Sequence, residues 1–328
     1  MKSKKAALIF CFLLYLATRP RALDAHPNQA HTVRGVVITT DGTVVPEFSV
    51  VVRPVADKPE LVERKHFKNG EFTIEGLTGD KYELQINSPS FIPARVDLDL
   101  KSKTALMDRR IIILHTFRNE RRLSPGAVQR VSLRKLQEKI PEAAHEAYGK
   151  GVELHRDGKL EDAMMEYGKA LRFYPNYVEA LSDLATIFLL YNRPESALTF
   201  LRRAQDLDGT NPVINLNVAI ALSEQADYSE AMKLLKKVIR DDPGTALAYF
   251  YEGRVYLMQK KYGEARQAAL KAVDVDPQLL DAWLLLVNAS TEDKKYDQAR
   301  SALTHVRQAI NNGKVAAFID EQLSTLGS

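Results

Sequence analysis

The sequence feature that most constrains the fold is a spacing of 34 residues that runs through the second half of the chain. Five alanines stand at this spacing, at Ala163, Ala197, Ala231, Ala265 and Ala299. Three of them are followed twelve residues later by a proline, at Pro175, Pro243 and Pro277. A fixed period of this length is typical of a solenoid in which helical hairpins stack and bury their apolar faces against each other. The period therefore predicts a binding scaffold, and it does not identify what is bound.

Aligned on these alanines, the segment 142–311 divides into five units, which start near Ala144, Val178, Pro212, Ala246 and Leu280. The eighth position holds a small residue in the first four units, and valine in the fifth. In chain order these residues are Gly151, Ala185, Ala219, Gly253 and Val287. Small residues there let two helices approach closely. The pattern resembles the tetratricopeptide repeat. That resemblance implies two antiparallel helices per unit and a concave groove lined by the first helix of each.

Two irregular places qualify the pattern. The second unit has Gly209 where the proline belongs and delays its proline to Pro212, which predicts a longer turn before the third unit. After the fifth unit, the segment 314–328 is amphipathic. Because a solenoid needs a cover for its last open face, we predict a capping helix there.

The helical period places an apolar and aromatic surface with a few polar anchors on the predicted groove. The residues on or near it are Tyr148, Val152, Asp183, Thr186, Leu216, Asn217, Ile220, Phe250, Tyr251, Arg254, Leu284 and Asn288. Repeat proteins that clamp a C-terminal carboxylate use lysine and asparagine where this chain has Tyr148, Val152 and Asp183, so that clamp is not supported. A short peptide or helix of a partner protein suits such a groove. Alternatively, Phe250 and Tyr251 pack between repeats.

In the segment 32–116 the hydrophobic period changes to two, as expected for strands. Turn signals separate about seven short strands within 32–39, 47–53, 61–67, 70–76, 81–87, 94–100 and 109–114. Asn69-Gly70 suits a two-residue hairpin turn, because both positions tolerate positive φ. The segment therefore predicts an antiparallel β-sandwich, followed by the all-α solenoid.

The same segment resembles the carboxypeptidase-regulatory-like domain, a transthyretin-like sandwich. The features that carry this are Gly35, Asp41-Gly42, Pro46, Gly70, Phe72, Ile74, Gly76-Leu77, Gly79, Tyr82 and Leu84. The resemblance implies an accessory module without catalysis of its own. Phe72, Ile74, Tyr82, Leu84 and Ile86 alternate as core residues. The alternative is a carbohydrate-binding fold that takes polysaccharide, with Tyr82 and Phe91 as its candidate exposed aromatics.

The N-terminal stretch predicts export. A lysine-rich start precedes the apolar run 6–17, which is shorter than the roughly 20 residues that cross a bilayer. We interpret 1–25 as a signal peptide cleaved before His26, which places the protein in the periplasm or at the cell surface without a stable transmembrane span. Arg19 and Arg21 leave an uncleaved membrane anchor as the alternative. The segment 117–141 is a basic linker, either solvated or able to bind anionic lipid or polysaccharide.

The remaining chain carries no sign of catalysis. Without residues 1–25 it has 41 basic residues (46 minus 5) and 41 acidic residues (42 minus 1), and this balance argues against nucleic acid as a partner. The seven histidines show no metal-binding spacing, and the single cysteine, Cys11, provides neither a disulfide nor a metal site. His145 and His155 are predicted on solvated helix surfaces. No nucleophile elbow, phosphate loop or dinucleotide fingerprint occurs. We predict a non-enzymatic scaffold without a cofactor.

Overall fold

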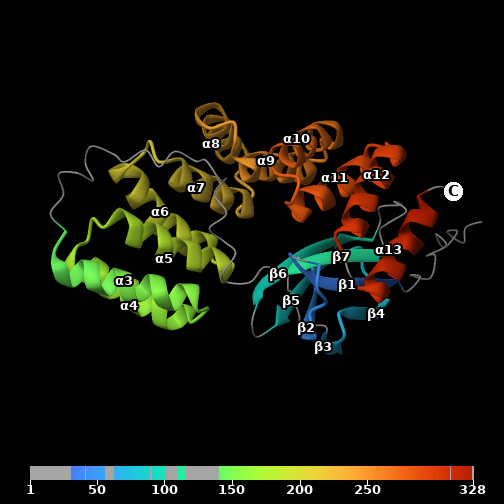
Figure 1. The fold of residues 1–328 in the computed structure, drawn as a ribbon, viewed down its shortest axis with the longest axis horizontal. Coiled ribbons are helices and arrows are strands. Elements are labelled where there is room, and N and C mark those ends of the chain that lie inside the picture. Colours follow the sequence, from blue (N-terminus) through green and yellow to red (C-terminus); the bar gives the residue numbers. More distant parts are fainter. Residues whose placement is uncertain are drawn as a thin grey trace, which may run out of the picture.

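The computed structural model describes residues 31–40, 42–55, 63–88, 91–100, 109–114, 140–310 and 312–326. Within these residues seven strands in two sheets precede eleven helices (Figure 1). The order of strands first and helical hairpins afterwards confirms the predicted fold class. The predicted signal segment 1–25 and nearly all of the basic segment 117–141 lie outside the described residues.

Each predicted strand is present, with shifted ends. The strands are β1 His31–Thr39, β2 Glu47–Pro54, β3 Glu63–Lys68, β4 Glu71–Leu77, β5 Lys81–Ser88, β6 Phe91–Asp99 and β7 Arg109–Leu114. One sheet has the order β4-β1-β7 and the other β3-β2-β5-β6. Every pair is antiparallel except β1 and β7, which run parallel. Strand β7 follows β6, a strand of the other sheet, so β7 and β1 are paired without being neighbours in the chain.

The turn at Asn69 and Gly70 has the predicted positive φ angles, 63° and 78°. It does not close a hairpin, however, because β3 and β4 belong to different sheets. Phe67 and Phe72, on either side of the turn, face each other across the sandwich interior with ring centroids 6.0 Å apart. Phe72 is buried and Phe67 partly buried between the sheets, which explains why the turn carries the chain from one sheet to the other.

The sandwich core consists of the residues predicted from the alternation. Phe72, Ile74, Tyr82, Leu84 and Ile86 are all buried, with exposed fractions of 6% or less. The hydroxyl of Tyr82 accepts a hydrogen bond of 2.8 Å from the backbone N–H of Gly79. Tyr82 is therefore a core residue, and its proposed role as an exposed sugar-binding aromatic is wrong. Phe91, the other candidate, is partly buried against the same core.

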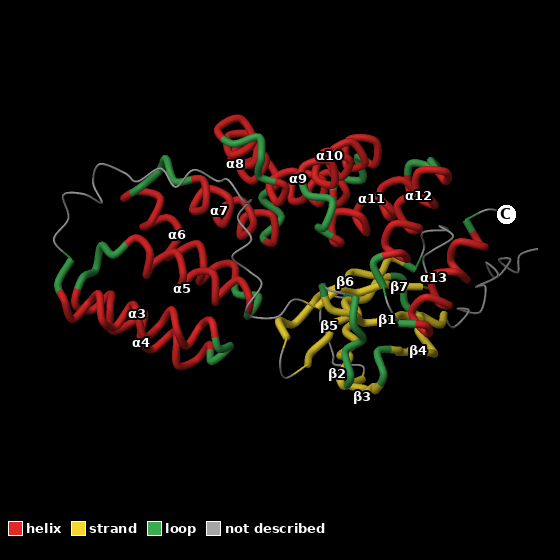
Figure 2. The backbone as a smooth tube through the Cα atoms, viewed as in Figure 1, coloured by secondary structure: helices red, strands yellow, loops and turns green. Residues whose placement is uncertain are grey.

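The helices form five consecutive hairpins and a last single helix (Figure 2). The first helix of each hairpin is α3 Glu142–Arg156, α5 Val178–Leu190, α7 Pro212–Glu224, α9 Ala246–Met258 and α11 Leu280–Glu292. The second helices are α4 Leu160–Phe173, α6 Pro194–Leu207, α8 Tyr228–Asp241, α10 Tyr262–Val275 and α12 Tyr296–Gln308. The five repeat alanines lie on these second helices and are 0% exposed. Helix α13, Gly313–Thr325, lies where the capping helix is predicted.

Turns within and between the hairpins are regular. One residue with positive φ recurs every 34 positions in the turn inside each hairpin, at Gly158, Asn192, Ala226, Lys260 and Lys294. Four residues separate successive hairpins in every case, at 174–177, 208–211, 242–245 and 276–279. The predicted longer turn after the second unit is therefore wrong. Gly209 occupies the usual proline position, and Pro212 is accommodated as the first residue of α7, where its missing N–H is no loss.

The sandwich packs directly on the C-terminal end of the solenoid. The outer face of sheet β4-β1-β7 shares one hydrophobic cluster with α11, α12 and α13, and we call this contact the apolar dock. Its buried members include Val36, Ile38 and Ile113 from the sandwich and Ile310, Val315 and Ile319 from the solenoid. The Nη2 atom of Arg34 lies 3.7 Å from a carboxylate oxygen of Glu321 at the rim of the dock. In Figure 1, α9, α10 and α11 lie above the sandwich, and α13 lies beside it at β7 and β1.

Candidate partner-binding groove

The first helices of successive hairpins are joined by a ladder of side-chain hydrogen bonds. Tyr148 on α3 donates to Asp183 on α5 at 2.9 Å. One step further, the Nδ2 atom of Asn217 on α7 donates to Thr186 on α5 at 3.3 Å. All four residues belong to the predicted groove surface, so the structure places them on neighbouring helices along one side of the solenoid. The ladder fixes the spacing of the first helices on the side where a ligand would lie.

The third step of the ladder involves Glu224 on α7, which was not among the residues predicted for the groove. Arg254 on α9 donates from Nη2 to Glu224 at 3.1 Å. The guanidinium carbon of Arg254 also lies 6.0 Å from the ring centroid of Phe250 and 5.4 Å from that of Tyr251. A guanidinium over aromatic faces is held by cation–π attraction. Arg254, Phe250 and Tyr251 thus form one preassembled group, while Glu224 lies 30 residues before Arg254, off the 34-residue period that located the other groove positions.

Phe250 and Tyr251 pack between repeats and also have a side that remains partly exposed, so both alternatives considered for them apply. Their rings meet edge to face, with centroids 5.1 Å apart. Tyr251 packs partly against the core cluster that contains Leu216, and Phe250 packs partly against the cluster that contains Leu285 of α11. Each ring therefore has one side in the repeat packing, while both stay half-buried and keep another side toward Arg254.

The other predicted groove residues differ in exposure. Leu216 is only 4% exposed and supports the groove from inside the helical layer. Ile220 is half-buried beside it. Asn288 on α11 is exposed and shares no hydrogen bond with the other predicted groove residues. The structure therefore brings together two groups, one around Tyr148 and Asp183 and one around Arg254.

An aromatic cluster supports the first of these groups. The ring of Tyr148 lies 4.8 Å from that of Tyr177 and 5.7 Å from that of Tyr167, measured between centroids. Burial, followed by the nearby carboxylates Glu179 and Asp183, raises the pKa of Tyr177 to about 12. Tyr177 therefore stays protonated well above neutral pH.

His155, behind this cluster, is buried, with 9% of its surface exposed. Its Nδ1 atom lies 3.2 Å from the hydroxyl of Tyr167. The prediction of a solvated side chain is wrong for His155, because the second helix of the hairpin covers that face. His145, by contrast, is exposed, as predicted.

Strand β6 of the sandwich lies against the middle of the solenoid, and we call this the β6 contact. Its outward side chains are Arg95, Asp97 and Asp99. When the amide oxygen of Asn192 is oriented toward the sandwich, this oxygen accepts a hydrogen bond of 2.7 Å from Nη2 of Arg95. Asn192 is the positive-φ residue of the turn between α5 and α6. The sandwich thus reaches the second repeat as well as the C-terminal end.

Asp97 continues the β6 contact toward the group around Arg254. Loss of solvent, followed by repulsion from Glu83 and Glu224, raises the pKa of Asp97, although the positive charges of Arg254 and Arg95 oppose this. Glu224 and Arg254 both belong to the groove ladder. The charges of Glu224 and Arg254 are therefore close enough to act on a carboxylate of the molecule's own β-sandwich.

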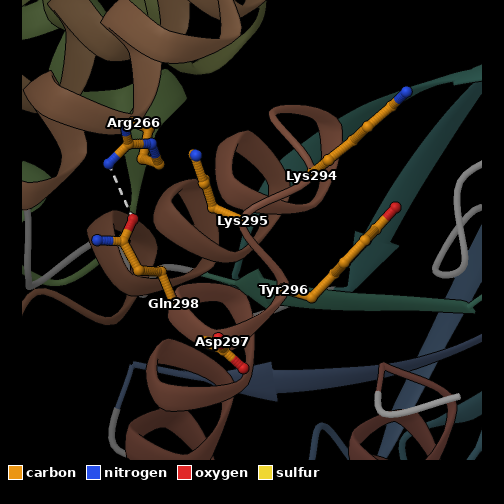
Figure 3. A pocket seen from close by; sticks show the side chains of 6 residues that line it. All are labelled: Arg266, Lys294, Lys295, Tyr296, Asp297 and Gln298. Atoms are coloured by element: carbon orange, nitrogen blue, oxygen red, sulfur yellow. Dashed lines mark hydrogen bonds between the residues drawn. The ribbon is translucent and has the colours of Figure 1, made fainter.

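An open surface hollow of about 540 Å³ lies away from the groove residues, at the turn between α11 and α12 (Figure 3). Arg266 forms part of its wall and donates to Asp293 and Gln298, both at 2.8 Å. Lys295 projects toward the Arg266 side, whereas Lys294 and Tyr296 project away. The basic groups do not converge on one point, so the hollow has no arrangement that would orient a bound anion.

The described residues contain no group of three or more His, Cys, Asp or Glu side chains placed to hold a metal ion. Over those residues, no helix is both long and apolar enough to cross a membrane.

The fold and the groove together define a helical-repeat solenoid that carries an N-terminal β-sandwich. Residues 216–279, which span α7 to α10, match the sequence model of the family described as Tetratricopeptide repeat. Tetratricopeptide repeat protein 8 of Caenorhabditis elegans is similar, with 22% identity over 178 residues, 49% of this chain and 35% of that protein. The solved structure of pilF from Pseudomonas aeruginosa covers 57% of this chain and 88% of its own, at a TM-score of 0.48 and 24% identity.

A further similar protein has an enzyme's name. Protein O-mannosyl-transferase TMTC3 of Mus musculus is 29% identical over 150 residues, which are 44% of this chain and 16% of that protein. This chain therefore spans well under half the length of both curated relatives. Their similarity concerns a segment, and the activity of each whole protein does not follow from it.

Proposed function

We propose that this protein is a non-enzymatic scaffold that binds a partner protein or peptide along the first helices of its repeats. The observation that carries this proposal is the ladder from Tyr148–Asp183 through Thr186–Asn217 to Glu224–Arg254. The ladder holds half-buried aromatic and polar groups at fixed spacing on one side of the solenoid. Preorganised groups of this kind lower the entropy lost on binding, and aromatic and arginine side chains commonly contribute most of the affinity.

The described part of the chain supports scaffolding better than catalysis. Its titratable groove residues are engaged in pairs between helices, such as Arg254 with Glu224, and none is paired as a nucleophile with a base. The β-sandwich serves as an accessory module in this proposal, with its core aromatics turned inward. Its role is to position the solenoid through the apolar dock.

Site-specific photo-cross-linking in the native host tests the groove. A benzoylphenylalanine at Asn217, on the ladder, is compared with one at Lys233, an exposed residue of the second helix α8. We expect a discrete adduct with one identified partner from position 217 and none from position 233. The same adduct from both positions, or none from position 217 or its ladder neighbour Thr186, would contradict binding in the groove.

The proposal includes export to the periplasm or cell surface, on the basis of the lysine-rich start and the apolar run 6–17. Fractionation of cells with N-terminal sequencing measures this directly. We expect the exported form to begin at His26, whereas an uncleaved anchor would keep residues 1–25 and pellet with membranes. Recovery of the intact chain in the cytosol would contradict export.

A further inference from the structure

Charge is divided unequally between the two helices of the hairpins. The five first helices together carry nine carboxylates and three lysine or arginine residues. The five second helices carry ten carboxylates and twelve lysine or arginine residues. The first helices are therefore acidic and the second helices slightly basic, a division that the balanced charge of the whole chain conceals.

The carboxylates of the first helices concentrate on the face that carries the ladder. Side chains at i, i+4, i+7 and i+11 share one face of a helix. Aligned by the 34-residue period, the residues at these four places form what we call the ladder stripe. Its members are His145, Gly149, Val152 and Arg156 on α3, Glu179, Asp183, Thr186 and Leu190 on α5, Val213, Asn217, Ile220 and Glu224 on α7, Leu247, Tyr251, Arg254 and Met258 on α9, and Asp281, Leu285, Asn288 and Glu292 on α11.

The ladder stripe has an excess of negative charge. It carries five carboxylates, none of them buried, against two arginines, Arg156 and Arg254. The charge of Arg254 is offset in place, because its Nη2 atom lies 3.1 Å from a carboxylate oxygen of Glu224. Carboxylates gathered on one face raise the local concentration of cations and repel anions. The stripe therefore favours a ligand with positive charge.

The same stripe offers apolar contact beside its carboxylates. Ile220, Leu247 and Tyr251 are half-buried. Met258 is 51% exposed and occupies in α9 the place that Glu224 has in α7. Methionine is flexible and polarisable, so an exposed methionine adapts to different apolar side chains of a ligand. A ligand that suits this face combines positive charge with an apolar residue.

The stripe already holds one cation in this manner. Arg254 lies over two aromatic rings and donates to a carboxylate while its side chain stays 41% exposed. Rings and a carboxylate also meet at the other end, where Tyr148 donates to Asp183 at 2.9 Å and lies 4.8 Å from the ring of Tyr177. The place that Arg254 has in α9 is taken in α5 by Thr186. A cationic side chain of a ligand can lie over these rings as Arg254 lies over its own.

We propose that the partner binds the ladder stripe through a cationic segment, whose lysine or arginine side chains face the carboxylates while an apolar side chain packs against Met258 and Tyr251. This inference rests on the proposed function, because it names the chemistry of the partner for the same groove. Opposite charge speeds the encounter and selects the partner, and the apolar contact adds affinity. The same carboxylates disfavour an acidic segment.

An array of short random peptides, probed with the purified full chain, tests the charge of the ligand. Peptides that need the stripe are those that bind the parent chain and Met165→Ser but bind Met258→Ser weakly. Both methionines are exposed, at 51% for Met258 and 60% for Met165, and Met165 lies on the second helix α4. We expect these stripe-dependent peptides to contain more lysine and arginine than aspartate and glutamate.

The affinity of the stripe-dependent peptides is then compared between two double variants. Glu179→Gln with Asp281→Asn removes two carboxylates of the stripe, and Asp162→Asn with Glu264→Gln removes two from second helices. All four carboxylates lie in the first turn of their helices, so the loss of favourable charge at the helix N-terminus is matched. We expect Kd to rise roughly three- to tenfold for the stripe variant, the size expected for two exposed ion pairs, and to stay unchanged for the control.

Stripe-dependent peptides that are neutral or acidic would overturn the cationic partner and leave binding in the groove intact. Equal Kd values for the two double variants would also overturn it, as would an array without any stripe-dependent peptide. The adduct from Asn217 decides the proposed function separately, because cross-linking does not require a charged partner. A basic cross-linked stretch of another protein supports the inference, whereas segment 117–141 of this chain or a second copy in its place would overturn it.

Discussion

The hydroxyl of Tyr148 on α3 donates a hydrogen bond of 2.9 Å to Oδ2 of Asp183 on α5, and so joins the first two repeats through their groove side. In a solenoid each repeat is stabilised by its neighbours only. The first repeat has one neighbour in the described chain, so it depends on this boundary more than the internal repeats depend on theirs.

We predict that Tyr148→Phe destabilises the first hairpin by about 1 kcal/mol, the usual contribution of one hydrogen bond. Amide hydrogen exchange should become faster in α3 and α4 and remain unchanged in α11 to α13. Tyr174→Phe is the matched control, because the ring of Tyr174 meets that of Tyr177 edge to face but its hydroxyl has no hydrogen-bond partner among the described residues. Equal effects of the two substitutions would show that the bond to Asp183 contributes nothing.

Two glycines of α3 should respond to alanine with opposite signs. Gly149 faces open space, whereas a Cβ atom on Gly151 would lie 2.6 Å from the ring of Tyr167. Because alanine favours a helix by about 1 kcal/mol over glycine, Gly149→Ala should stabilise the hairpin. Gly151→Ala should destabilise it by about 1–3 kcal/mol through overpacking. Hydrogen exchange in α4 measures both, and protection of the same sign in both variants would contradict the assigned packing.

The helices and strands could be predicted from periodicity, because the residues close to each other in sequence largely determine the local secondary structure. The 34-residue spacing of Ala163 and its equivalents located the hairpins, and the alternation from Phe72 to Ile86 located the sandwich core. Periodicity could not predict that the turn at Asn69 and Gly70 joins strands of two different sheets. Whether two strands join one sheet or two depends on the burial of Phe67 and Phe72, which is decided by the whole sandwich.

The sequence of β1 and β7 contains a sign of the apolar dock that the alternation of apolar and polar residues does not reveal. Val36 and Val37 on β1, like Ile111, Ile112 and Ile113 on β7, are apolar at consecutive positions. Consecutive apolar residues are typical of a strand that is covered on both faces. The second cover is the C-terminal end of the solenoid, more than 170 residues away in sequence. That partner could not be identified from local pattern alone.

The groove was only partly predictable for a related reason. The helical period correctly located Tyr148, Asp183 and Arg254 on the first helices, but it cannot give side-chain pairing between repeats. Glu224 was missed because its partner Arg254 lies 30 residues away. Asn192 was missed because its partner Arg95 belongs to the sandwich.

The fit at the dock can be tested through Gly42. Gly42 and Gly76 both have a φ of 79°, so alanine is strained at both positions. Only at Gly42 would the new methyl group also meet the backbone of Ala309, at 2.7 Å. We expect Gly42→Ala to cost about 1–3 kcal/mol more than Gly76→Ala. Urea unfolding followed by the fluorescence of Trp283, whose indole stacks on His305 in the last repeat, reports this end of the solenoid. Equal midpoints would contradict the close contact at Gly42.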